Sequence, residues 1–253
     1  MPIAWLKRLF IRRKLRTGQT DHKLGNDSTN QQSQARRTRP TPSFLSRTEG
    51  LLTAVHLVAS GWPEQLPQSD HDMRVWHGPG GLTVSLTIVL RSETPMRWSD
   101  IEKLRRDSRA IAQGSDAGLI EANFVETTLG RSAQFIYKQS QGSGFWFTGM
   151  LLTPLQKETI VWTASCTEGQ LTGVREAIVT AELLQRGELT LESYEQSWAQ
   201  DPYDANYSGI ERRKLRYESD DERYDLRFPE HPLSRVRNAL RELAHRVTVD
   251  LPS

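Results

Sequence analysis

The sequence predicts an α+β protein in which one antiparallel sheet is flanked by helices. Four strand-like segments follow one another between residues 119 and 169, and only short turns separate them. Short turns join neighbouring strands in antiparallel fashion. Helix-like segments stand on either side of this block, an order typical of the α+β class. A basic, polar N-terminal section contrasts with this ordered middle and is predicted to be an arm.

Three sections are expected along the 253 residues. Residues 1–49 are predicted to form a basic amphipathic arm and a disordered linker, residues 50–200 the α+β domain, and residues 201–253 an acidic and aromatic segment with a C-terminal helix. The arm holds eleven Lys and Arg residues against three acidic ones, a net charge of +8, which leaves −6 for the remainder of the overall +2. Residues 17–43 are too polar to offset their ordering entropy by burial.

The domain is predicted to open with a hairpin. A strand containing Trp76 precedes the breaker HGPGG, and every second residue from Leu82 to Ile88 is a large aliphatic one. This alternation indicates a strand with one buried face. The next stretch, WSDIEKLRRDSRAIAQG, predicts a helix with Ser99 as its N-cap and Gly114 at its end.

The last of the four strands, ETIVWTASCTEG, predicts one apolar face. That face consists of Ile160, Trp162, Ala164 and Cys166. Cys166 is interpreted as a small buried hydrophobe, since a reactive thiolate needs a basic and partly exposed environment. A helix is predicted in GQLTGVREAIVTAELLQRG, and a shorter one in LTLESYEQSWAQ. The apolar stripe of the longer helix is Val174, Ile178, Ala181 and Leu184.

The C-terminal segment LSRVRNALRELAHRV predicts a helix with one apolar seam. The seam residues, predicted to bind a partner surface, are Leu233, Val236, Leu240, Leu243 and Val247. An apolar seam of this size is costly to leave in water. It is therefore expected to dock, either on this chain's own sheet or on a second copy. Docking within the chain is favoured, because apolar and aromatic residues precede the helix and can anchor its approach.

A family resemblance follows from this order of elements. The early SGW, the paired strands, the helix and the strands leading to TASCTEGQLTGVREAI resemble the PsbP-like family over roughly residues 55–185. The resemblance implies an α+β fold and a role as a binding or assembly factor rather than an enzyme. It implies no catalytic residue, because no shared catalytic motif is known.

The opening stretch MPIAWLKRLFIRRKL is the first candidate binding site. As a helix it separates large apolar side chains from basic ones, which is typical of an interfacial helix on anionic lipid. The residues concerned are Trp5, Leu6, Lys7, Arg8, Leu9, Phe10, Arg12 and Arg13. Attachment to a membrane or to a partner protein is the preferred interpretation. An organellar transit peptide, a nucleic-acid arm and a frayed terminus stay open.

No catalytic residue, metal site or cofactor is predicted. The segment from Asp70 to His77 also contains His71 and Asp72, which could bind a divalent metal, but polar residues are expected in a loop anyway. The sequence therefore predicts a non-enzymatic binding, assembly or adaptor protein of unknown ligand and partner. The alternatives are a metal-assisted hydrolase that uses this loop, and nucleic-acid binding through the arm. A single cysteine favours a cytoplasmic protein, with attachment to a membrane surface as a further expectation.

Overall fold

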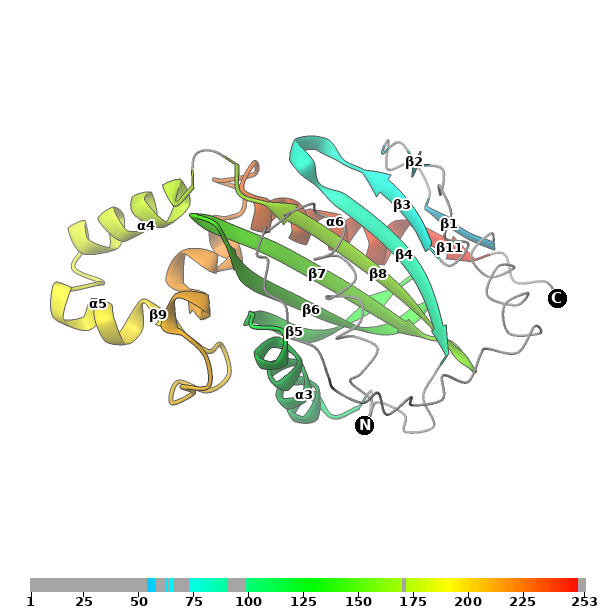
Figure 1. The fold of residues 1–253 in the computed structure, drawn as a ribbon, viewed down its shortest axis with the longest axis horizontal. Coiled ribbons are helices and arrows are strands. Elements are labelled where there is room, and N and C mark those ends of the chain that lie inside the picture. Colours follow the sequence, from blue (N-terminus) through cyan, green and yellow to red (C-terminus); the bar gives the residue numbers. More distant parts are fainter. Residues whose placement is uncertain are drawn as a thin grey trace, which may run out of the picture.

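Figure 1 shows the computed structural model of the chain, a twisted sheet with helices on both faces and a group of shorter elements beyond one end. The structure describes residues 54–57, 62, 64–65, 73–90, 99–169 and 172–249. The predicted arm and its linker lie outside the described residues.

The elements are named in chain order. The strands are β1 (Val55–Leu57), β2 (Glu64–Gln65), β3 (Met73–His77), β4 (Thr83–Leu90), β5 (Gly118–Thr127), β6 (Gly130–Gln141), β7 (Gly144–Pro154), β8 (Glu158–Thr167), β9 (Ala199–Gln200), β10 (Arg216–Tyr217) and β11 (Val247–Val249). The α-helices are α3 (Ile101–Gly114), α4 (Val174–Gln185), α5 (Leu191–Ser197) and α6 (Pro232–Arg246). Single 3-10 turns span Pro79–Gly81 (η1), Arg212–Lys214 (η2), Glu218–Asp220 (η3) and Glu222–Tyr224 (η4).

The main sheet has seven strands in the order β2-β3-β4-β8-β7-β6-β5, and all neighbours are antiparallel. The predicted α+β class is confirmed, as are the hairpin of β3 and β4 and the four successive strands from β5 to β8. Two small two-stranded sheets pair β1 with β11 and β9 with β10.

Helix α6 covers one face of the sheet, behind β7 and β8 in the view of Figure 1. The five residues of the predicted seam are between 0% and 2% exposed and belong to the main apolar core. Four of them lie on α6, but Val247, which was expected in the helix, lies in β11. On β7, a Cβ at Gly149 would lie 2.6 Å from Leu240 Cδ1 and 2.7 Å from Val236 Cγ1, so the absent side chain lets the helix approach closely. The C-terminal section therefore shares its core with the sheet.

Helix α3 lies against the opposite face and buries Leu104 and Ile111 there. The expected cap at Ser99 is wrong: the N-cap is Asp100, whose carboxylate accepts a hydrogen bond from the Lys103 amide at 2.9 Å. A carboxylate at this position also meets the positive end of the helix dipole. The helix ends at the glycine that the sequence predicts.

Strand β8 shows how the sheet separates two apolar layers. Trp162 and Cys166 point to the α6 side and are buried, as predicted, whereas Val161, the residue before Trp162, packs on the α3 side. Trp162 also meets Trp76 of β3, with ring centroids 5.4 Å apart. None of the helices in the described ranges is long and apolar enough to span a membrane.

Candidate functional site

Helices α4 and α5 and strand β9 lie together beyond one end of the sheet, where Figure 1 draws them in yellow-green to orange. They have a small apolar core of their own. It includes Val179 and Leu183 of α4, Trp198 after α5, Leu215 and Tyr224. This end of the molecule is therefore stabilised separately from the two layers of the main sheet.

Helix α4 is turned in an unexpected direction, because its apolar stripe is not its buried face. The helix buries Arg175, Val179 and Leu183. Val174 at the start of the stripe is 46% exposed, and Ile178 is also exposed. The apolar pattern in the sequence thus marks a face that the chain leaves open.

A buried arginine fixes this orientation. The Arg175 guanidinium donates hydrogen bonds to the carbonyl oxygens of Ser219 at 2.6 Å and Asp221 at 2.8 Å. It also donates to the Ser234 hydroxyl at 2.9 Å and to the Asp225 carboxylate at 3.1 Å. Because four acceptors surround one buried cation, rotating α4 to bury its apolar stripe would leave the guanidinium and its acceptors without these partners.

A second buried ion pair lies beside the first. Lys138 Nζ is 2.6 Å from Asp220 Oδ2, and both side chains are fully buried. The ammonium is 3.4 Å from the ring centroid of Tyr217 and 4.9 Å from that of Phe145. Burial acts to raise the pKa of Asp220, but the Lys138 charge and the hydrogen bonds from Lys138 and the Tyr217 amide outweigh it and hold that pKa below its ordinary value.

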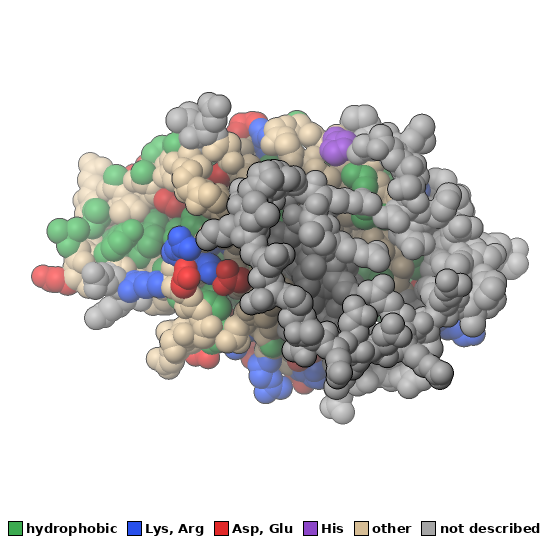
Figure 2. Space-filling view, viewed as in Figure 1, with side chains coloured by type: hydrophobic (Ala, Val, Ile, Leu, Met, Phe, Trp, Pro, Cys, Tyr) green, Lys and Arg blue, Asp and Glu red, His purple; other side chains and the backbone are tan. Residues whose placement is uncertain are grey.

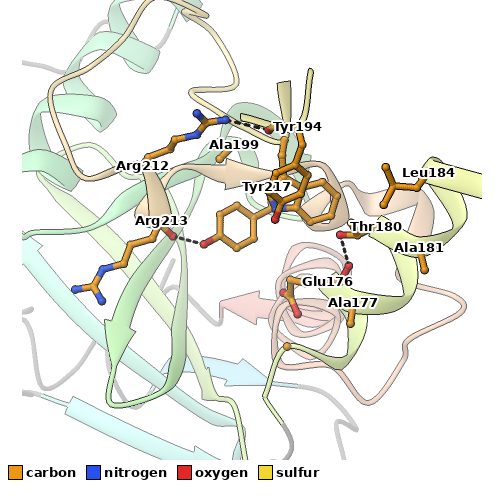
Figure 3. Close-up of a pocket in the computed structure, with 12 residues that line it drawn as sticks. Glu176, Ala177, Thr180, Ala181, Leu184, Tyr194, Ala199, Arg212, Arg213 and Tyr217 are labelled. Atoms are coloured by element: carbon orange, nitrogen blue, oxygen red, sulfur yellow. Dashed lines mark hydrogen bonds between the residues drawn. The ribbon is translucent and has the colours of Figure 1, made fainter. Parts of the chain in front are cut away.

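A groove of about 900 Å³ opens between α4 and the segments that follow it, and we call it the α4–α5 groove. Figure 3 shows Ala177 and Ala181 of α4 on one side and Tyr194 and Tyr217 on the other. Trp198 also lines the groove. Its ring stacks on Tyr194 with centroids 5.5 Å apart and meets Tyr217 at 5.9 Å. The groove thus has one wall of small residues and one aromatic wall.

Glu176 contributes a carboxylate to this groove (Figure 3). Its side chain is only 14% exposed, and none of the described side chains donates a hydrogen bond to either oxygen. Burial raises the pKa of Glu176, and the negative charge of Asp220 raises it further. The groove therefore ends at a carboxylate whose charge is poorly compensated.

Glu168, Glu176 and His231 form the one group in the described part of the chain with the residue types and closeness of a metal site, with ligand atoms within 4.8 Å of one another. Nε2 of His231 is 3.5 Å from Glu168 and 3.9 Å from Glu176. However, Nδ1 of His231 accepts a hydrogen bond from the Leu233 amide at 3.3 Å and caps α6. The ring proton is therefore on Nε2, which directs an N–H group toward the carboxylates. This tautomer fits a metal ion poorly, because a metal would have to replace that proton.

The two helices beside the groove carry exposed apolar side chains, of which Tyr194 also lines the groove. Among the described residues, four of the five large apolar side chains that are exposed belong to α4 and α5, and Figure 2 shows apolar side chains gathered at this end. The four are Val174, Ile178, Leu191 and Tyr194, and the fifth is Leu226.

The residues predicted as sites lie elsewhere. The eight N-terminal residues from Trp5 to Arg13 fall outside the described residues, as do Asp70, His71 and Asp72. His77 is exposed on β3. The predicted partner-binding seam of α6, residues 233–247, is occupied by the chain's own sheet, which is the arrangement that the intramolecular alternative expects.

Sequence reasoning missed the groove. The stripe of α4 was visible in the sequence, but its exposure was not. The aromatic wall comes from residues 194–217, and no spacing rule connects that segment to Glu176. Arg175, a charged residue beside the stripe, is the one available signal, but the sequence shows neither that it is buried nor which residues accept its hydrogen bonds.

Comparisons with known proteins find remote structural matches only. No model of a known protein family matches the sequence, and no curated protein matches it. The chain is similar to the Saccharomyces cerevisiae Ran-binding protein Mog1p, with 11% identity and a TM-score of 0.34 over 54% of this chain and 80% of that one. A point mutant of protein Mog1 gives 10% identity and a TM-score of 0.36 over 78% and 90% of the two chains.

A third match is LpqN of Mycobacterium tuberculosis, a protein involved in cell envelope biogenesis, with 13% identity and a TM-score of 0.28 over 55% of this chain and 80% of that one. Matches this distant carry no argument about function. The α+β class rests on the sheet and helices described above, and the PsbP-like resemblance stays a prediction.

Proposed function

We propose that the chain is a non-enzymatic protein-binding module of the adaptor or assembly class, and that the α4–α5 groove docks an apolar segment of a partner protein. The observation that carries the proposal is the gathering of exposed apolar side chains on α4 and α5, the two helices beside the groove. A contiguous apolar patch with a polar rim is typical of an interaction site.

The composition of the groove supports a peptide-like partner. Tyrosine and tryptophan supply large contact areas at low entropic cost and are enriched at protein interfaces. The walls contain Tyr194, Trp198 and Tyr217, while Ala177 and Ala181 leave space for side chains of a partner. A volume of about 900 Å³ accommodates several side chains at once.

The proposal is tested by selecting binders from a phage-displayed library of random peptides on the full chain. Selected peptides are then measured against Ala181→Glu, which places a charge on the exposed wall of the groove. The matched control is Leu226→Glu, which adds the same charge to an exposed apolar residue outside the groove lining.

We expect Ala181→Glu to weaken the peptides by about tenfold or more, because a carboxylate would have to be buried against apolar side chains. Leu226→Glu should leave the affinity unchanged. If no peptide family is enriched, or if both variants bind like the unmodified chain, the groove is not a docking site.

A further inference from the structure

We infer that the segment docked in the α4–α5 groove carries a single basic side chain, a lysine or arginine, whose cation binds the Glu176 carboxylate beside the aromatic wall. This inference rests on the proposed function and adds the chemistry of the partner.

The first argument is the state of Glu176 itself. A carboxylate that is largely withdrawn from water and has no hydrogen-bond partner is costly, and a protein normally supplies a donor or a cation. In the described part of the chain no side chain donates to either oxygen of Glu176. The closest approach of a basic side chain is His231 Nε2, 3.9 Å away. The carboxylate is therefore open to a cation that arrives through the groove.

The second argument is the balance of charge around it. Glu168 and Asp220 are the other carboxylates whose negative charges act on Glu176. Lys138 Nζ pairs with Asp220 at 2.6 Å. The basic side chain nearest to both Glu168 and Glu176 is His231. The charge of Arg175 also acts on Asp220, but its hydrogen bonds go to Asp225 and to backbone carbonyl oxygens. Neither Lys138 nor Arg175 pairs with Glu168 or Glu176, so one added positive charge would reduce the local excess of negative charge.

The third argument concerns the rim, where the arginines are already engaged. Arg212 donates to the Tyr194 carbonyl oxygen at 3.0 Å, and Arg213 donates to the Glu211 carboxylate at 2.7 Å. Neither arginine therefore pairs with Glu176. Their positive charges also repel additional cations at the entrance, which favours one basic residue among apolar ones over a polybasic segment.

The aromatic wall suits the same ligand. Aromatic faces attract cations, and the stems of lysine and arginine are apolar. Tyr194, Trp198 and Tyr217 line the groove together with Glu176, so an alkyl stem can pack on rings while its charged head meets the carboxylate.

A second hollow in the described structure provides a contrast. It has a volume of about 640 Å³ and is lined by both arginines and carboxylates. There Arg216 pairs with Asp221 at 2.7 Å, and Arg237 pairs with Glu121 at 3.2 Å. Because these charges compensate each other, this hollow gives no reason to expect a charged ligand, in contrast to the α4–α5 groove.

The inference is tested by a double-mutant cycle with the selected peptides. One partner in the cycle is the full chain or Glu176→Gln, which keeps the shape and removes the charge. The other is the peptide with its basic residue or with norleucine in that place. Glu182→Gln is the matched control, because Glu182 lies on the same helix but pairs with Arg227 outside the groove lining.

With the unmodified chain and with Glu182→Gln, we expect the basic peptide to bind about tenfold more tightly than the norleucine peptide. With Glu176→Gln this preference should fall to within about twofold. A preference that persists unchanged in Glu176→Gln would overturn the inference, and so would selected peptides without a basic residue.

The two proposals fail in different ways. If selected peptides are sensitive to Ala181→Glu but indifferent to Glu176→Gln, the groove is a docking site and only the basic residue is refuted. If Ala181→Glu has no effect, the docking site itself is refuted.

Discussion

Helices α6 and α4 are both amphipathic, yet the chain uses their apolar faces in opposite ways. Helix α6 buries its whole seam on the sheet, where Gly149 makes room for Leu240. Helix α4 buries Arg175 and leaves Val174 and Ile178 exposed. The comparison teaches that an apolar stripe does not by itself decide which face of a helix is buried, because on α4 the hydrogen bonds of Arg175 fix a different face.

The largest expected effect concerns the layer under α6. Trp162→Ala should lower the free energy of unfolding by about 3–5 kcal/mol, because it empties a large aromatic site in a packed core. Trp162 is 1% exposed and adjoins Trp76. Urea denaturation measures the effect. A free energy of unfolding close to that of the unmodified chain would show that packing in this layer contributes little to stability.

At the other end of the molecule, a buried charge should be nearly as important. Asp220→Asn keeps the size of the side chain but leaves the Lys138 ammonium buried without its anion, and we expect a loss of about 3 kcal/mol. Lys138→Met combined with Asp220→Asn should recover part of that loss. If the double variant is less stable than Asp220→Asn alone, the pair is not the reason for the loss.

A matched pair of substitutions on α4 sharpens the comparison further. Val179→Ala should cost about 2 kcal/mol, since Val179 is fully buried in the small core. Val174→Ala should stay within about 0.5 kcal/mol of the unmodified chain, since that side chain is exposed. Equal losses in thermal or urea unfolding would contradict the orientation of the helix.

The last stability effect is expected from Glu176→Gln and depends on pH. The pKa of Glu176 in the folded chain is raised above its ordinary value of 4.5, so folding favours the neutral acid. The contribution of the neutral acid to the free energy of unfolding is therefore fully present below pH 4.5 and is lost as the pH rises through the folded pKa. Glutamine cannot lose a proton, so the variant should be more stable near neutral pH and equal to the unmodified chain near pH 4.

The ionisable groups that face Glu176 are Glu168 after β8, Asp220 of η3, Lys138 of β6 and His231 at the start of α6. These groups are the same in both proteins, so the difference between the two unfolding curves isolates Glu176. A variant that is less stable at neutral pH would show that the carboxylate already has a partner within the chain.

The difference between the two regions also explains what could be predicted from the sequence. The sheet is predictable from the alternation of apolar and polar residues in β4 and β8 and from the short turns between strands. The seam of α6 is predictable because its apolar residues recur every three or four positions. Both signals work because burial of apolar side chains dominates in this region. At the α4 end the decisive contacts join Arg175 to residues 219–234 and Lys138 to Asp220. Sequence patterns place charged residues at the surface, so they do not reveal contacts of this kind.

The most direct test of the central claim is hydrogen exchange of the full chain, measured by mass spectrometry with and without a selected peptide. The account predicts that the bound peptide slows amide exchange in residues 174–200 and 212–217, and leaves α6 and the strands β4 to β8 unchanged. Protection confined to α6 or to the main sheet, with none over α4 and α5, would contradict it.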